Sequence, residues 1–258
     1  MITLHEQLAA PCPLPLVING LSGGAIDAFA VETLRDAGRK SLALVRSDQE
    51  AARLCAVLAD SGLRVAVYAS RELCFFESSA SHDVERERLS VLYRFLADEL
   101  DVIVTTPYAA LQPTMPPERL LELSAETATL SPDALVLRLL ELGYVRVDAV
   151  ESAGQFSRRG GIVDLFPSGE EMPLRLDYFG DEIDRATSFD PITQRTVGET
   201  TPPILLPARE VICDKEGLSR VEKTILAAEK KADEKTREAL SAELEAIASG
   251  RELSFLDK

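Results

Sequence analysis

A glycine-rich turn near the start of the chain is the first place where residue types and spacing could do chemistry. Its glycines are Gly20, Gly23 and Gly24, with an apolar run at 16–18 before them and a helical run at 25–37 after them. A strand, a glycine-rich turn and a helix in this order are typical of loops that hold phosphate groups. Such a loop has the pattern G-x-x-x-x-G-K-[ST], in which the lysine reaches the phosphates and the hydroxyl binds magnesium.

The residues that would hold a nucleotide are missing from this turn. Counted from Gly20, the last three positions of the pattern are Ala25, Ile26 and Asp27, so neither the lysine nor the hydroxyl is present. An aspartate there is more typical of a first-turn carboxylate favoured by the helix dipole, and Lys40 lies beyond the helix. We therefore predict a nucleotide-binding fold whose site is lost. A tight strand-to-helix turn is the favoured interpretation of Gly20, Gly23, Gly24, Ile26 and Asp27.

A candidate β-hairpin at 158–183 is the second constellation. Two apolar-rich strands flank a turn at 168–170, and side chains alternate between the two faces of a strand. If Pro167 lies opposite Pro173, Phe179 lies opposite Gly161. Parity then predicts a packed face of Ile162, Phe166, Leu174, Leu176 and Tyr178, with Asp164 as its awkward member. The other face would carry Arg159, Arg175, Asp177 and Phe179.

The residues alone do not decide between two interpretations of that second face. A phenylalanine between two arginines on a half-open sheet face is typical of a protein–protein interface. Alternatively, the arginines simply pair with Asp177 and Asp181.

The composition and net charge of the chain exclude several classes of function. The chain has 258 residues, 46% of them hydrophobic and 28% charged, and a formal net charge of −15. This charge argues against autonomous binding to duplex DNA, which depends on Lys and Arg meeting phosphates. The cysteines Cys12, Cys55, Cys74 and Cys213 form no C-x-x-C unit, and His5 and His82 lie far apart. We therefore expect no metal site, no catalytic residues and free thiols in a reducing cytoplasm.

Alternating apolar strands and helical runs predict an α/β fold in the first part of the chain. Strands are expected at 16–18, 41–45, 64–68 and 101–106, and helices at 25–37, at 48–61 with Asp48 as cap, and at 83–99. Such alternation favours a parallel sheet covered by helices. No apolar run reaches the roughly 20 residues that span a bilayer, and no secretory signal is expected.

The pattern changes after the prolines at 113–117. Ser131 or Asp133 can begin a helix that ends before Gly143, and the closely spaced turns at 144–200 predict a small α+β insert with antiparallel strands. A strand at 204–206 would return to the first sheet, followed by one long helix at 218–249. The expected domains are 1–124, an inserted domain at 125–204, and a returning strand and helix at 205–258.

Three blocks around the hairpin resemble a known family. They are RGGIVDLFP at 159–167, RLDYFGDEID at 175–184 and FDPITQR at 189–195, in the order and spacing of the UvrB-like module. That module is shared by the excision-repair protein UvrB and the transcription-repair coupling factors. The resemblance covers essentially 15–210, and is strong after Leu135. It implies a degenerate RecA-like (P-loop NTPase-type) sheet domain with an inserted small α+β domain.

Two departures favour the coupling-factor branch of this family. The phosphate loop is degenerate, and the stretch 69–83 is too short for the tyrosine-rich hairpin with which UvrB holds DNA; its aromatic residues are Phe75 and Phe76. The resemblance therefore implies an N-terminal fragment without enzymatic activity. The polymerase-interacting domain and the ATP- and magnesium-dependent translocase motor would lie beyond Lys258.

The function implied by the resemblance is recruitment of UvrA to stalled RNA polymerase in nucleotide excision repair. The UvrA-contacting residues of the family fall on Arg159, Arg175 and Phe179, which we expect to be solvent-exposed. Contacts with RNA polymerase and DNA would be made by other domains, and no membrane is involved. The alternatives are an autoinhibitory platform for the motor and a UvrB-like DNA-processing module.

Overall fold

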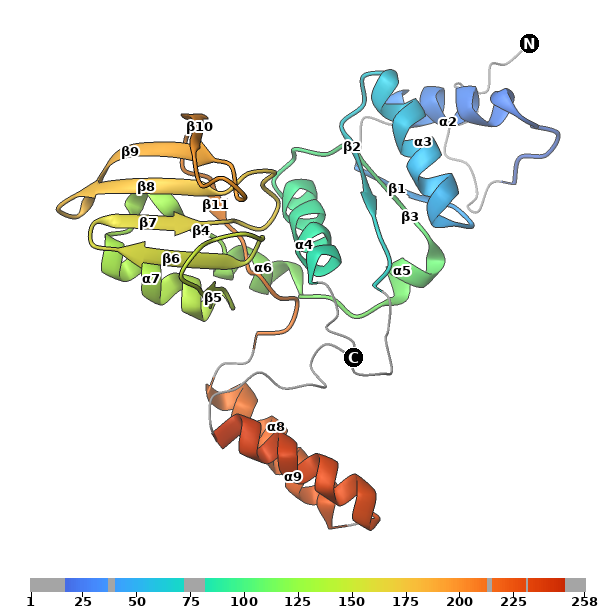
Figure 1. The fold of residues 1–258 in the computed structure, drawn as a ribbon. Helices are drawn as coiled ribbons and strands as arrows, with labels where there is room; N and C mark the ends of the chain where they lie inside the picture. The colour runs from blue at the N-terminus through green and yellow to red at the C-terminus, as the bar shows by residue number, and fades with distance from the viewer. Residues whose placement is uncertain (1–16, 37–39, 72–81, 213–214, 231, 249–258) are drawn as a thin grey trace. The chain divides into compact units, whose positions relative to one another are not determined.

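The structure, a computed structural model of the 258-residue chain, describes residues 17–36, 40–71, 82–212, 215–230 and 232–248. Contacts divide the chain into two units (Figure 1). The first unit contains Met1–Arg71 and Glu87–Pro113, and the second contains Glu72–Arg86 and Thr114–Lys258. The domain limits expected from the sequence stay a prediction.

A small parallel sheet forms the first unit. Its strands are β1 (Ser41–Leu44), β2 (Val65–Tyr68) and β3 (Val102–Thr105), in the order β1-β3-β2 with both pairings parallel. The helices that accompany them along the chain are α2 (Gly24–Asp36), α3 (Asp48–Asp60), α4 (Asp83–Leu96) and α5 (Pro107–Leu111). Helical crossovers are the usual way to join parallel strands. The predicted parallel sheet with covering helices is confirmed.

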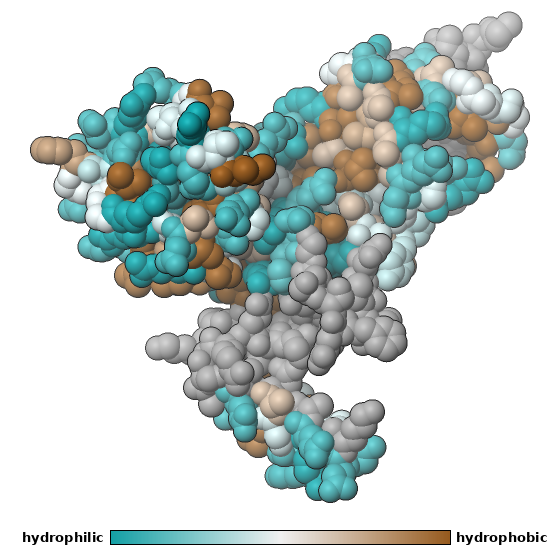
Figure 2. Space-filling model, in the orientation of Figure 1, coloured by the Kyte–Doolittle hydropathy of each residue, from teal (hydrophilic) through white to brown (hydrophobic). Residues whose placement is uncertain are grey.

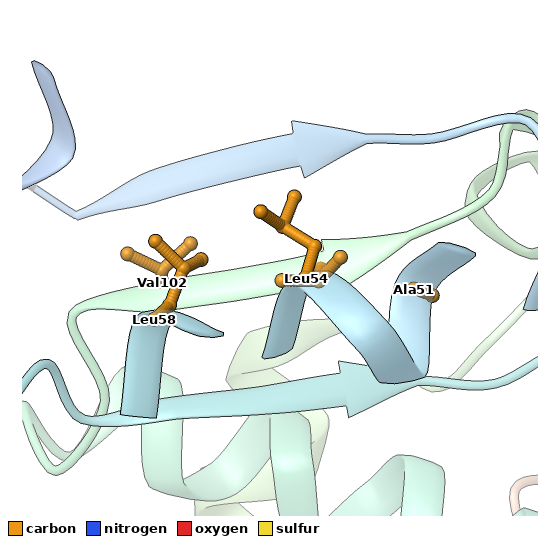
Figure 3. Close-up of a cluster of buried hydrophobic side chains, with 5 residues drawn as sticks. Ala51, Leu54, Leu58 and Val102 are labelled. Atoms are coloured by element: carbon orange, nitrogen blue, oxygen red, sulfur yellow. The ribbon is translucent and has the colours of Figure 1, made fainter. Parts of the chain in front are cut away.

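The core of this unit lies on both faces of β3, which is buried along its whole length. On one face, α3 contributes apolar side chains that pack against the strand (Figure 3); this cluster contains Ala51, Leu54, Leu58, Val102 and Val104. The cluster on the other face contains Tyr68, Val91, Leu100, Ile103 and Ala109. Burial on both sides explains why the strand reads as a continuous apolar run.

Two local predictions for the first unit are wrong. Val17 and Ile18 are not in a strand, and Leu16 lies outside the described residues. The cap of α3 is Ser47, not Asp48: the Ser47 backbone is extended and its hydroxyl accepts a hydrogen bond from the Glu50 N–H at 3.2 Å. Asp48 lies in the first turn, where the helix dipole favours a carboxylate.

A six-stranded sheet dominates the second unit, in the order β10-β9-β8-β7-β6-β5. Its strands are β5 (Val145–Arg146), β6 (Gln155–Arg159), β7 (Ile162–Leu165), β8 (Leu174–Phe179), β9 (Glu182–Phe189) and β10 (Thr196–Glu199). All neighbouring pairs are antiparallel except β5 and β6. The antiparallel character predicted for 144–200 is therefore confirmed, with one parallel pair at the edge.

One helix lies along one face of this sheet, α7 (Pro132–Glu141) (Figure 1). The Ser131 hydroxyl caps it by accepting from the Ala134 N–H at 3.4 Å, and Gly143 follows its end with a φ of +80°. Tyr178 of β8 donates from its hydroxyl to the Leu130 carbonyl at 3.1 Å, next to the start of the helix. The predicted helix and its stop are confirmed, with Ser131 as the cap.

The C-terminal part differs from its prediction in two ways. The strand at 204–206 forms as β11 (Ile204–Leu205), but it pairs antiparallel with β4 (Ala125–Glu126), not with the parallel sheet. The long helix is instead two helices, α8 (Lys215–Glu229) and α9 (Glu234–Ala248), which contact each other. Asp233 causes the second start, because its carboxylate accepts the Thr236 N–H at 2.9 Å and caps α9.

No helix in the described part of the chain is long and apolar enough to cross a membrane. Of the predicted free thiols, Cys55 carries no disulfide, and burial raises the pKa of its thiol. Cys12, Cys74 and Cys213 lie outside the described residues, as do His5 and the pair Phe75 and Phe76.

A buried polar cluster joins distant segments of the second unit. The Glu85 carboxylate, 5% exposed, contacts His82 Nδ1 at 2.9 Å and accepts the Glu210 N–H at 3.1 Å. The Glu210 carboxylate in turn accepts the Thr114 hydroxyl at 2.9 Å. Burial alone would raise the pKa of the Glu85 carboxyl, but these hydrogen bonds outweigh burial and its pKa is lowered.

The lowered pKa of Glu85 predicts that the second unit loses stability at acidic pH. Since the folded pKa lies below the ordinary value of 4.5, Glu85 stabilises the fold above about that pH, and the contribution is lost as pH falls through the folded pKa. Glu85→Gln should therefore show a smaller loss of melting temperature than the unmodified chain between neutral and acidic pH. Equal losses in both proteins would contradict the assignment, because other carboxyls are common to both.

Candidate protein-docking surface

Two short hairpin turns lie at the same end of the six-stranded sheet. Gly160 and Gly161 join β6 to β7, and Gly180 and Asp181 join β8 to β9. The φ angles of Gly160 and Gly180 are +65° and +66°, which a two-residue hairpin turn beginning with glycine allows. A Cβ on Gly161 would lie 3.1 Å from the Tyr178 carbonyl oxygen, so the close approach of β7 and β8 also favours glycine.

The register of β7 and β8 differs by one residue from the predicted register. Asp164 lies opposite Arg175 and Ile162 lies opposite Asp177, whereas the expected pairing placed Gly161 opposite Phe179. A one-residue shift exchanges the two faces of a strand. The packed face of β7 is therefore Val163 and Leu165, and the prediction that Ile162, Asp164 and Phe166 share it with Leu174 and Leu176 is wrong.

The observed register places Asp164 beside Arg159 and Arg175. Its carboxylate, 1% exposed, accepts from Arg159 Nη2 at 2.6 Å, and from Arg175 Nε at 2.7 Å and Nη2 at 3.0 Å. These hydrogen bonds raise the pKa of the Arg175 guanidinium, which also lies 4.8 Å from the centre of the Phe189 ring. Both arginines are thus paired, but with Asp164 and not with Asp177 or Asp181.

The three residues predicted to contact a partner differ in how much of each is exposed to solvent. Phe179 is 85% exposed at the end of β8, and Figure 2 shows an apolar group projecting where the β8–β9 hairpin ends in Figure 1. The side chain of Arg159 is 58% exposed, but that of Arg175 is only 20% exposed. The expectation that all three are freely exposed is wrong for Arg175, because it lies over Asp164 and Phe189.

The face that carries these residues is partly covered away from the two turns. Farther along the sheet, Gln194 donates to the Val150 carbonyl at 3.0 Å, and Thr187 and Phe189 are buried. On the opposite face, Arg158 forms an ion pair with Asp133 of α7. Along the strands, Arg175 and Phe179 share one parity, and Arg159 joins them through the pairing of β6 with β7. The structure therefore places the three residues on one face.

The glycine-rich turn has a different environment. Gly20 and Gly23 have φ angles of +90° and +54°, and α2 begins directly afterwards at Gly24. Ile26 is 48% exposed, and Asp27 forms an ion pair with Arg53 of α3 at 2.6 Å. The hydrogen bond from Arg53 lowers the pKa of the Asp27 carboxyl. A charged carboxylate paired to the neighbouring helix thus stands where a phosphate loop has its hydroxyl.

We predict that the chain does not bind Mg-ATP. Ile26 replaces the phosphate-gripping lysine, Asp27 adds negative charge, and Lys40 is paired with Asp98 at 2.7 Å. Isothermal titration with Mg-ATP should give only the heat of dilution. A saturable signal with a micromolar dissociation constant would contradict the prediction.

No group of three or more His, Cys, Asp or Glu side chains among the described residues could hold a metal ion. Comparison with known proteins identifies the class. Residues 121–211 match the family of UvrB interaction domains, so the second unit carries a UvrB interaction domain. Over most of its length, the chain is homologous to the N-terminal region of transcription-repair coupling factors.

The share of this chain that is covered differs among the relatives. The transcription-repair-coupling factor of Bacillus subtilis (strain 168) is 31% identical over 226 residues, which is 84% of this chain and 18% of the relative. That of Escherichia coli (strain K12) is 39% identical over 145 residues, 54% of this chain and 12% of the relative. The UvrABC system protein B of Chlorobaculum tepidum is 34% identical over 140 residues, 53% of this chain and 20% of the relative. The chain thus spans a fifth or less of the length of these curated relatives.

Proposed function

We propose that this chain is a non-catalytic docking module that binds UvrA through Arg159, Arg175 and Phe179. In a transcription-repair coupling factor, it would recruit UvrA in the cytoplasm to RNA polymerase stalled at DNA damage, as a step of nucleotide excision repair. The observation that carries the proposal is the 85% exposed Phe179 on the same open sheet face as two arginines, within the UvrB interaction domain. Contacts with RNA polymerase and DNA belong to other domains of the whole protein.

The chemistry of this surface supports a protein partner. Aromatic residues and arginines are the side chains that contribute most to protein–protein interfaces. A phenylalanine that stays in water exposes a large apolar area, and docking into a pocket on the partner removes that area from water. Arginine offers planar donor pairs to carboxylates, and Arg159 keeps most of its side chain exposed.

The first unit is, in our proposal, a RecA-like domain that has lost its nucleotide site. The parallel order β1-β3-β2, the helices on both faces and the glycine-rich turn before α2 support this origin. The ion pair of Asp27 with Arg53 supports the loss of the site.

A direct binding measurement tests the proposal. The chain is immobilised, purified UvrA is passed over it, and the affinity is compared with that of Phe179→Ala. Ile192→Ala is the matched control, since Ile192 is a 90% exposed apolar residue at the β9–β10 turn, at the other end of the sheet. UvrA binding by the unmodified chain and by the control, but not by Phe179→Ala, supports the proposal. No UvrA binding by the unmodified chain would overturn it.

The alternative of a UvrB-like DNA-processing module predicts DNA binding, and we expect little. The net charge of −15 opposes association with a phosphate backbone. In a gel-shift assay at low salt, a duplex and a single strand should both run unshifted in the presence of micromolar chain. A tight complex that weakens steeply with added salt would instead favour the DNA-processing alternative.

A further inference from the structure

Asp164 lies at the centre of the docking surface, yet it is too buried to contact a partner. It belongs to β7, between β6 with Arg159 and β8 with Arg175, and it is 1% exposed. Arg175 approaches it side-on through Nε and Nη2, and Arg159 approaches through Nη2 alone. One carboxylate therefore holds two guanidinium groups from the two flanking strands.

This arrangement sets the net charge of the three-residue cluster. The carboxylate contributes −1 and the two guanidinium groups +2, so the cluster keeps one positive charge. Arg159 uses one of its five N–H donors on Asp164, and no other hydrogen bond from its side chain occurs within the described residues. The side chain of Arg159 is 58% exposed, so its remaining donors are accessible to a carboxylate of the partner.

Fixing the arginines in advance reduces the cost of binding. A free arginine side chain samples many rotamers, and part of this entropy is lost when an interface immobilises it. In the unbound chain, the hydrogen bonds to Asp164 already restrict the two guanidinium groups. The desolvation of the buried carboxylate is likewise offset by its two partners before docking.

We propose that Asp164 is the positioning residue of the docking surface: it holds Arg159 and Arg175 in their binding geometry and leaves one net positive charge for an acidic site on UvrA. This inference rests on the proposed function and adds a residue that contacts the partner only through the arginines.

A double-mutant cycle on UvrA affinity tests the positioning role. Asp164→Asn keeps the shape but removes the charge, and we expect it to weaken UvrA binding about five- to tenfold. In an Arg175→Ala background, the same substitution should have a smaller effect, because Arg159 is then the one side chain left for Asp164 to position. The matched control is Asp177→Asn, a carboxylate on the same face without an ion pair to either arginine, which should change affinity less than about twofold. Additive losses in the cycle would overturn the proposal.

A measurement without UvrA separates this proposal from the proposed function. In the NMR spectrum of the free chain, the Nε–H of Arg175 should exchange slowly with solvent, and Asp164→Asn should make its exchange fast. If UvrA does not bind but this change is seen, the proposed function fails and the positioning stands. Fast exchange in the unmodified chain would overturn the positioning role whatever UvrA does.

Asp164→Glu covers the case in which Asp164→Asn does not fold. It retains the negative charge that compensates the arginines but shifts the carboxylate by one methylene group. We expect a folded protein with weakened UvrA binding, since the guanidinium groups must move with the carboxylate. Unchanged affinity in this variant would overturn the proposal.

Discussion

Phe179→Ala is expected to lower UvrA affinity about thirtyfold, because truncating an interface anchor costs about 2 kcal/mol or more. The melting temperature should change by no more than about 2 °C, since an exposed side chain contributes little to folding. The physical reason is the 85% exposure of Phe179: its ring makes little contact within the chain and can be buried only by a partner.

Affinity and melting temperature must be measured on the same preparations, with Ile192→Ala alongside. An intact affinity in Phe179→Ala would mean that the end of the β8–β9 hairpin does not dock. A large fall in its melting temperature would mean that the ring packs within the chain. Either outcome contradicts the prediction.

Arg175→Ala is expected to lose UvrA binding and also more stability than Arg159→Ala loses. Removing Arg175 takes three interactions from the folded chain: two hydrogen bonds to the buried Asp164 and the contact with the Phe189 ring. Leaving a buried carboxylate with one partner costs about 2–3 kcal/mol. For a chain of this size, that corresponds to a fall of roughly 5–10 °C in melting temperature.

Arg159→Ala provides the comparison because its side chain is 58% exposed and makes one hydrogen bond to Asp164. We expect it to weaken UvrA binding with a smaller loss of stability than Arg175→Ala. Calorimetric melting of both variants decides between the two roles. Equal melting temperatures would show that Asp164 does not depend on Arg175 more than on Arg159.

The parallel sheet could be predicted from the sequence because burial on both faces leaves an unbroken apolar run. Val102, Ile103 and Val104 form such a run, and the helices on either side of the strand have their own amphipathic pattern. The alternation of strands and helices then leaves few arrangements other than parallel pairing. The six-stranded sheet was predicted only as an antiparallel region, since its edge strand β5 has two residues.

The register at the docking surface could not be predicted from the two prolines that were used to set it. A two-residue turn fixes the pairing of its strands, but the connection between β7 and β8 is longer and permits more than one register. The signal that was missed lies within β7 itself, where Asp164 stands between the apolar Val163 and Leu165. Alternation along β7 puts Val163 and Leu165 on the packed face, so Asp164 lies on the other face with the arginines.

The boundary between the two C-terminal helices also has a signal in the sequence that the prediction missed. Asp233 precedes Glu234 within a charged stretch that looks uninterrupted, and aspartate is a favoured residue before the first turn of a helix. The partner of β11 could not be predicted in this way. β4 has only two residues, and its pairing depends on contacts between segments far apart in the sequence.

The strand order of the six-stranded sheet has a consequence for how the docking surface forms. From β6 to β10, each strand pairs with its neighbour in the sequence, so the contacts are local. Arg159, Asp164, Arg175 and Phe179 all lie on three consecutive strands of this meander. Closing short loops costs little chain entropy, and topologies of low contact order fold fast. The surface can thus assemble from one contiguous stretch of chain, without waiting for the long-range pairing that the parallel sheet requires.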